Sequence, residues 1–276
     1  GKVKISLYEG TLGAPADAWD MVKNNAVQFT FTSDANNAGR MPILAMASLP
    51  LTYPSTKALW LTANEWLKAG YLKELTDNFK VIYFYGTSPL SLFLGNKKVV
   101  SANDLKGLKI RCGGAVQCQS VAALGASGVN MPFGELYMAI QTRMIDGAIS
   151  GVDIMYDRKF YEVTKYVPKQ PLYFGIYTLL MNKETWNDLP PELQKLIDQT
   201  AKEISTAEVD RRMREEQSSW DAYGKKTEVY SLSSAEVAKL SQALEGITDK
   251  YVKDASAKGY PAKEALELAR KVVGRH

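Results

Sequence analysis

The chain has 276 residues, of which 46% are hydrophobic and 23% charged, a globular composition long enough for two lobes with separate cores. Its formal charge of +4 comes from 34 basic and 30 acidic residues that are interspersed, which argues against a polybasic surface for nucleic acid or membranes. No apolar run reaches the roughly 20 residues of a membrane span, and no leader pattern is present, so a leader has been removed or never existed.

The first third of the chain alternates predicted strands and helices. Apolar residues with a period of two predict strands over 2–8 and 27–32, with a helix over 15–22 between them. Ser55 is placed to cap a helix that continues to Gly70. The nearly continuous apolar run over 79–85 predicts a strand that is covered on both faces.

The middle of the chain repeats this pattern. Ser101 and Asp104 predict a capping-box turn before a strand over 108–111, and a helix ends near Gly125. Next come a helix over 133–142, a turn at 146–147, a short strand at 148–149 and a long strand over 172–181. The alternation predicts an α/β fold with largely parallel sheets.

One long helix is predicted after Pro190-Pro191, because no Gly or Pro interrupts 193–223. At 1.5 Å per residue it would be about 46 Å long, longer than a small domain. Its apolar positions change face between the two halves, so we interpret it as one helix packed on two lobes. The alternative is a broad apolar face or a break near Asp210. The first face comprises Leu193, Ile197, Ala201, Ile204 and Ala207, and the second Val209, Met213 and Trp220.

Histidine and cysteine limit the chemistry of the chain. The only histidine is the last residue, His276, which leaves none for an internal Ser-His or Cys-His pair or a zinc site. An enzyme would therefore need a Lys, Asp, Glu or Tyr base. Cys112 and Cys118 are compatible with a disulfide in an oxidising compartment and equally with two buried thiols.

Arg111 is the leading candidate for a ligand-binding residue. It ends a predicted strand and precedes two glycines and a helix N-terminus, which is where α/β sheets bind their ligands. Its planar guanidinium fits a carboxylate with two hydrogen bonds. The alternative is a surface or interlobe salt bridge, because such junctions are common. The glycine pair matches neither a P-loop nor a dinucleotide fingerprint.

Aromatic residues are the second group of candidates. Phe133 begins a helix after Met131-Pro132, where it is either a core residue or the wall of a pocket. Two predicted strands are rich in aromatic residues, which we expect to be mostly core, with a few at strand ends lining a cleft. These residues are Tyr83, Phe84, Tyr85, Tyr173, Phe174 and Tyr177.

An ordered set of motifs covers about half of the chain. They are the run DLKGLKIR from Asp104 to Arg111, Gly125-Ala126, Met131 to Tyr137, Gln141, Asp146-Gly147, Phe160 to Val163, Lys165-Tyr166 and the helix entry at Leu189-Pro190. This set resembles the solute-binding proteins of TRAP (tripartite ATP-independent periplasmic) transporters, of the dicarboxylate-binding (DctP-like) type.

The resemblance implies a two-lobed clamshell with a long helix beneath both lobes. Lobe I is expected to comprise 1–88 and 177–216, and lobe II 89–176 and 217–276, with a further strand and helix of lobe I preceding this sequence. The carboxylate-binding arginine of the family corresponds to Arg111 and its aromatic wall to Phe133. Ser150, Ser88, Thr87 and Tyr173 complete the expected ligand-binding residues.

Departures from the family pattern bear on the ligand. The usual Gln-Glu-Asn-Pro is here 148–151, Ala-Ile-Ser-Gly, and Ser88 stands where binders of larger sugar acids carry a second arginine. Cys112-Gly113 replaces the usual Val-Pro. Because fewer polar groups face the ligand, we expect a less hydroxylated monocarboxylate, either aromatic or a 2-oxo acid.

The function implied is that of a periplasmic binding protein that delivers a carboxylate to the small and large subunits of a TRAP permease, its signal peptide removed. No catalysis, cofactor, metal, nucleic-acid partner or direct membrane insertion is expected. The alternatives are a binding protein of an ATP-driven importer or sensor, and an enzyme acting on an organic acid without histidine.

Overall fold

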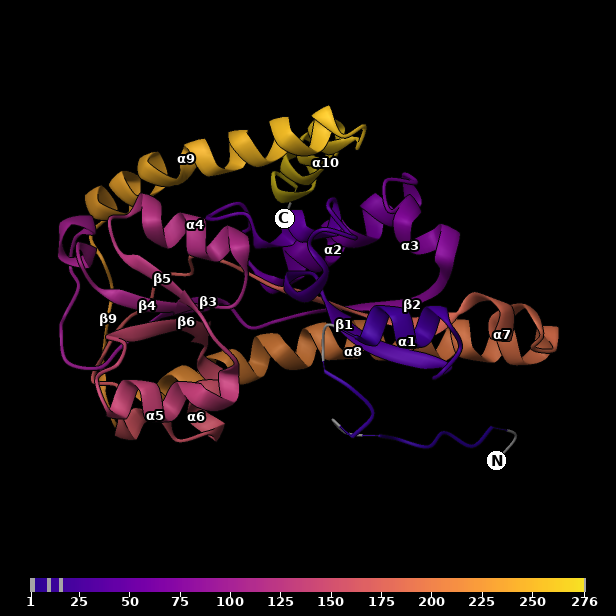
Figure 1. The fold of residues 1–276 in the computed structure, drawn as a ribbon, viewed down its shortest axis with the longest axis horizontal. Helices are drawn as coiled ribbons and strands as arrows, with labels where there is room; N and C mark the ends of the chain where they lie inside the picture. Colours follow the sequence, from indigo (N-terminus) through magenta and orange to yellow (C-terminus); the bar gives the residue numbers. More distant parts are fainter. Residues whose placement is uncertain (1–2, 9–10, 15–16, 276) are drawn as a thin grey trace.

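The computed structural model describes residues 3–8, 11–14 and 17–275, and it shows two lobes joined by one long helix (Figure 1). Each lobe is built around its own sheet, with three strands in lobe I and six in lobe II. The lobe I sheet has the order β1 (Phe29–Ser33), β8 (Ile176–Asn182), β2 (Phe79–Gly86). The lobe II sheet has the order β5 (Ser127–Asn130), β4 (Lys109–Cys112), β6 (Gly147–Gly151), β3 (Leu90–Leu94), β7 (Tyr166–Pro168), β9 (Glu228–Tyr230).

Helices cover both sheets. Lobe I carries α1 (Ala18–Lys23), α2 (Thr56–Lys68), α3 (Lys73–Asn78), α7 (Lys183–Asn187) and α10 (Ala262–Val273). Lobe II carries α4 (Ala115–Ala123), α5 (Leu136–Gln141), α6 (Val152–Asp157) and the first half of α9 (Ser234–Ala257), whose second half packs on the lobe I core. The helix α8 (Pro191–Gly224) runs beneath both lobes (Figure 1).

Local signals in the sequence place several elements correctly. Ser55 accepts a hydrogen bond from the amide of Ala58 and begins α2 as predicted. The capping box at Ser101 and Asp104 is present, with both reciprocal hydrogen bonds. The predicted helix over 133–142 forms as a 3₁₀ turn at Phe133–Glu135 followed by α5.

The prediction of a strand over 2–8 is wrong for the described residues 3–8. They form no regular structure, and the side chains of Val3, Ile5 and Leu7 are 48%, 64% and 81% exposed. An alternating apolar pattern makes a strand only where a neighbouring strand supplies hydrogen bonds, and no strand pairs with these residues.

The expectation of largely parallel sheets is also wrong. Both neighbours of β8 in lobe I pair with it antiparallel, and β3 is antiparallel to β6 and β7 in lobe II. The cause is the crossing between lobes: β2 leaves lobe I and β8 returns to it, so the two strands run in opposite directions. Parallel pairing remains between β4, β5 and β6 and between β7 and β9.

The long helix α8 serves both cores, as predicted, but with one face. Its buried residues lie within about 100° of one another at 100° per residue. Ile204 and Met213 are 47% and 45% exposed, so the predicted change of face is wrong. The hydroxyl of Ser205 accepts from Trp60 Nε1 and donates to the carbonyl of Phe84, which places a polar residue on the buried face. The buried residues are Ala201, Ser205, Val209, Trp220 and Tyr223.

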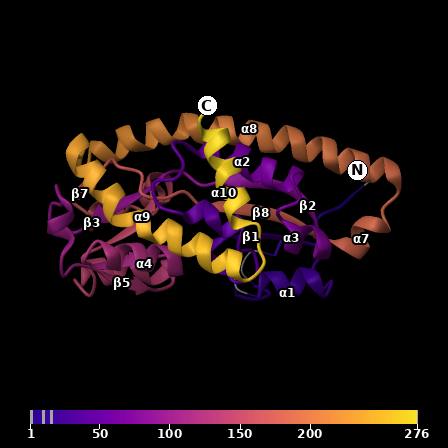
Figure 2. The ribbon, with the colours of Figure 1, turned by 90° about the horizontal axis from the view of Figure 1, so that it is seen from above.

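The C-terminal helices divide between the lobes. From above, α9 covers α4 of lobe II, whereas α10 lies against α2 of lobe I (Figure 2). Trp66 in α2 donates its Nε1–H to the carbonyl of Ala265 at 2.8 Å, and the small residues Ala262 and Ala269 are fully buried. The expected boundary assigned 217–276 to lobe II; the structure packs α10 into the lobe I core instead.

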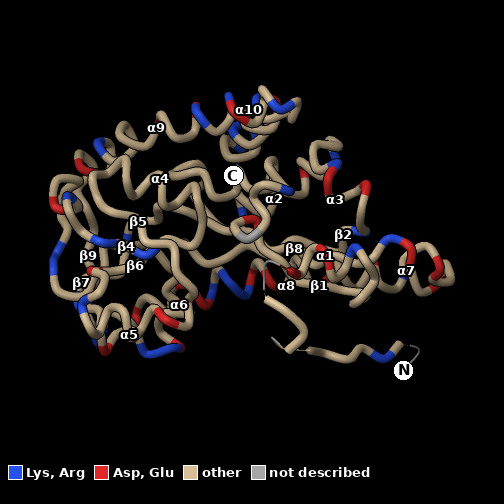
Figure 3. Tube along the Cα trace, in the orientation of Figure 1, with Lys and Arg blue, Asp and Glu red and all other residues tan. Residues whose placement is uncertain are grey.

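No helix in the described part of the chain is long and apolar enough to cross a bilayer. Basic and acidic residues are mixed over both lobes (Figure 3).

Candidate functional site

Two chain segments cross between the lobes side by side. The amide of Thr87 donates to the carbonyl of Gly175, and the amide of Gly175 donates back to Thr87 Oγ1, both at 2.9 Å. One step further, the amide of Leu90 donates to the carbonyl of Tyr173 at 2.8 Å. This short two-stranded crossing, together with α8, forms the connection about which the lobes could move.

Arg111 lies at the carboxyl end of β4, as predicted, and faces lobe I. Its Nε donates to the carbonyl of Met131 at 3.3 Å, and its guanidinium carbon lies 5.8 Å from the ring centre of Phe133. Burial lowers the pKa of Arg111, with the Tyr177 hydroxyl opposing that shift. No acidic group among the described residues lies within ion-pair distance of it. A partly buried guanidinium without a carboxylate partner is energetically costly.

The turn that follows Arg111 is held by the protein itself. Cys112 and Cys118 form a disulfide with their Cα atoms 5.3 Å apart, which resolves the alternative left open by the sequence. The amide of Gly113 donates to Gln117 Oε1 at 2.9 Å. A Cβ at position 113 would lie 3.4 Å from Arg111 Nη1, an ordinary van der Waals distance, so this turn borders the guanidinium directly.

Lobe I contributes an aromatic wall of three residues, Phe31, Tyr85 and Tyr177, from all three strands of its sheet. The rings of Phe31 and Tyr177 stack at 5.1 Å with an interplanar angle of 7°. Tyr85 meets them edge-on at 5.6 and 6.2 Å. Burial and the negative charge of Asp34 raise the pKa of Tyr177, and the positive charge of Arg111 opposes that shift.

The other four expected ligand-binding residues lie in the core of lobe II, in β6 and along the crossing between the lobes. Tyr173 is 1% exposed and belongs to the lobe II core, and Thr87 ties the crossing. Ser150 lies in β6 opposite Ser91, and both Ser150 and Ser88 are buried. The structure thus places Phe133 beside Arg111, buries Tyr173, Ser150 and Ser88, and leaves Thr87 half-buried in the crossing.

Sequence reasoning included Tyr85 and Tyr177 only in a group of mostly core aromatic residues, and it missed Phe31. Phe31 was recognised only as a strand residue, yet its side chain is 45% exposed. The signal was present in β2, where Tyr83 and Tyr85 alternate with the buried Phe84. Two aromatic residues on the face of β2 opposite Phe84 indicate that this strand has an apolar surface on both of its faces.

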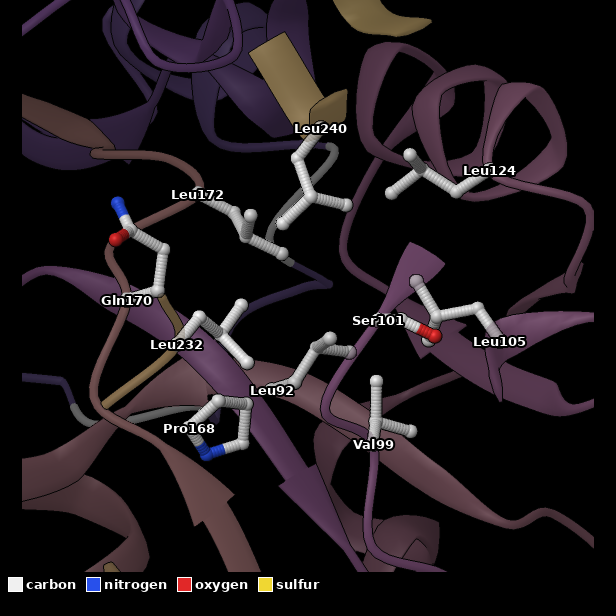
Figure 4. A pocket seen from close by; sticks show the side chains of 10 residues that line it. All are labelled: Leu92, Val99, Ser101, Leu105, Leu124, Pro168, Gln170, Leu172, Leu232 and Leu240. Carbon is white, nitrogen blue, oxygen red and sulfur yellow. The ribbon is translucent and has the colours of Figure 1, made fainter. Parts of the chain in front are cut away.

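Two small cavities among the described residues are each too small for an organic acid. One in lobe II is lined by converging leucine side chains with Ser101 and Gln170 at its margin (Figure 4). Its volume is about 10 Å³, close to the minimum for one water molecule. A second cavity of about 10 Å³ lies between Asp34 of lobe I and Gly114 of lobe II. In the described residues, no group of three or more His, Cys, Asp or Glu lies together to hold a metal ion.

Comparison with known proteins places the fold. A family model described as bacterial extracellular solute-binding protein, family 7, matches residues 1–254. A 2,3-diketo-L-gulonate-binding periplasmic protein of Escherichia coli is 25% identical over 209 residues, which cover 74% of this chain and 63% of that protein. The chain thus spans somewhat less than two thirds of that relative.

Solved structures are similar over nearly the whole chain. A TRAP solute-binding protein specific for aromatic acid ligands, from an unidentified marine microbe, was solved with metahydroxyphenylacetate. It superposes with a TM-score of 0.84 at 26% identity, covering 95% of this chain and 84% of that one. A TRAP solute-binding protein of Rhodoferax ferrireducens with copurified benzoate gives 0.83 at 26% identity, with coverage of 96% and 84%. These matches confirm the expected two-lobed α/β fold.

Proposed function

The chain belongs to family 7 of the bacterial extracellular solute-binding proteins, and on that premise we propose that it captures an aromatic monocarboxylate between its lobes for a TRAP permease. Arg111 binds the carboxylate. Phe133 from lobe II and the aromatic wall from lobe I enclose the body of the ligand.

The observation that carries this proposal is the state of Arg111. Its only hydrogen bond among the described residues, to Met131, is long, and it faces no described carboxylate. Three other arginines, Arg40, Arg211 and Arg212, are in ion pairs. A ligand carboxylate would supply the missing partner, with two hydrogen bonds to the planar guanidinium.

The chemistry around Arg111 favours an apolar ligand body. Burying a benzene-sized ring against Phe133 and the aromatic wall gains ~25 cal/mol per Å² of apolar surface, with edge or stacked ring contacts adding about 0.5–1.5 kcal/mol. Sugar hydroxyls without partners there would each cost about 1–3 kcal/mol. The structural relatives with benzoate and metahydroxyphenylacetate support this choice, whereas the diketogulonate-binding relative shows that the family also accepts sugar acids.

The disulfide supports a location outside the cytoplasm. Disulfides persist in oxidising compartments such as the periplasm, and Cys112–Cys118 lies beside the proposed site. We therefore place the protein in the periplasm, where it would pass its ligand to the small and large permease subunits.

The test is the identity of the bound ligand. Small molecules released from freshly purified protein are identified by mass spectrometry, and benzoate, 3-hydroxybenzoate, galacturonate and gluconate are compared by thermal shift. We expect an aromatic monocarboxylate in the extract and the largest shift from an aromatic acid, recovered chemically unchanged. A sugar acid giving the largest shift would refute the proposed ligand class, and turnover of the added acid would indicate an enzyme.

A further inference from the structure

Arg212 on α8 contacts both lobes at once. Its guanidinium carbon lies 4.6 Å from the ring centre of Tyr85, in the aromatic wall of lobe I. Its Nη1 pairs with Asp153 in the first turn of α6, in lobe II. The side chains of Arg212 and Asp153 are only 19% and 22% exposed, so their attraction is less screened than that of a surface pair.

The Asp153 carboxylate lies against Gly151. A Cβ at position 151 would lie 2.7 Å from Asp153 Oδ1 and 3.6 Å from the Cβ of Ser88, in the crossing segment. An alanine there would therefore force the Asp153 carboxylate, which pairs with Arg212 through Oδ2, to shift. A glycine at position 151 therefore leaves space for the Asp153 carboxylate, a role that the sequence alone did not indicate.

The neighbouring Arg211 offers a contrast on the same helix. Its side chain is 43% exposed, and its ion pairs are with Glu208 and Glu215, both on α8. Glu208 also lies 3.5 Å from Arg212 Nε, within the same charged stretch of α8. Arg211 therefore contacts one helix, whereas Arg212 connects that helix to two lobes.

We propose that Arg212 and Asp153 form a strut between the lobes that holds Tyr85 in the aromatic wall and thereby sets the preference for an aromatic ligand. Arg212 is a positioning residue, because Arg111 supplies the cation for the ligand. This inference rests on the proposed function for its ligand class but not for its mechanical part, the connection between lobes.

The design compares three variants with one control. Arg212→Met keeps the length of the side chain but removes its charge, Asp153→Asn removes the partner charge, and Gly151→Ala moves the Asp153 carboxylate without changing either charge. The control is Arg211→Met, which removes an equivalent positive charge from the same helix. Gly151→Ala keeps the proposal testable if Arg212→Met fails to fold.

Two measurements are made on each protein. X-ray scattering without ligand reports the separation of the lobes. Calorimetry with benzoate and with propionate separates the contribution of the aromatic wall to affinity from that of Arg111. Both probes carry a carboxylate for Arg111, but only benzoate has a ring that can contact Tyr85.

We expect the three variants to have a larger radius of gyration than the wild type. Their affinity for benzoate should fall at least about fivefold more than their affinity for propionate, because the cation–π contact is lost and the Tyr85 ring is misplaced. The Arg211→Met control should match the wild type in radius of gyration and in affinity for both probes. Equal weakening of both probes, or unchanged scattering, would overturn the strut. If the wild type fails to bind benzoate, the proposed function fails, and the scattering of ligand-free protein alone decides whether the strut exists.

Discussion

Truncation of Arg111 isolates the electrostatic part of binding. In the ligand-free protein, Arg111→Ala removes one long hydrogen bond and a 5.8 Å contact with Phe133, and it also removes a partly buried charge without a described partner. These effects oppose each other, so we expect unfolding free energy to change by less than about 1 kcal/mol.

In the complex, the same change leaves a ligand carboxylate buried without its partner. Such truncations cost about 2–5 kcal/mol, which corresponds to an affinity loss of roughly 30- to several-thousand-fold. Arg111→Lys should recover only part of this loss, because an ammonium cannot reproduce the planar pair of donors.

Isothermal titration calorimetry with benzoate measures the loss, and thermal unfolding confirms that each variant is folded. Arg40→Ala is the matched control, because Arg40 is exposed, pairs with Asp20 and lies over the ring of Trp19 in lobe I. Affinity of Arg111→Ala within threefold of the wild type would refute the assignment of the carboxylate site.

Three further predictions concern stability and motion. Replacing Cys112 and Cys118 by serine should lower unfolding free energy by about 2 kcal/mol in denaturant titrations, since the closed loop is short. Burial raises the pKa of Asp34, which faces Tyr53, Tyr177 and Tyr251, to about 6, so its stabilising protonated form is lost as pH rises through that value. The wild type should therefore lose on the order of 3 kcal/mol of unfolding free energy from this group between pH 4 and pH 8, measured by urea unfolding, whereas Asp34→Asn should not show this loss. Saturating benzoate should reduce the radius of gyration of the wild type in X-ray scattering; an unchanged profile would argue for a rigid pocket.

Elements with local signals could be predicted from the sequence. The caps at Ser55 and Ser101 act within one turn, and the length of α8 follows from the absence of Gly and Pro, so neighbouring residues contain the necessary information. Strand direction could not be predicted, because it depends on where the chain crosses between lobes. The face of α8 was misjudged because Ser205 is buried through hydrogen bonds to residues far away in the sequence.

The same distinction applies to the site. Arg111 and the glycines after it are adjacent in sequence, so their arrangement at the end of a strand could be anticipated. The aromatic wall joins Phe31, Tyr85 and Tyr177 from three separate strands, and only the pairing of β8 with both neighbours brings them together. Tyr173, close to Tyr177 in sequence, lies in the other lobe's core, because the crossing passes between them.

A crystal structure of the protein with benzoate tests the central claim most directly. We expect both carboxylate oxygens at about 2.8 Å from nitrogen atoms of Arg111, with the ring between Phe133 and Tyr177. A benzoate whose carboxylate pairs with another cation, or that binds outside the space between the lobes, would contradict the account.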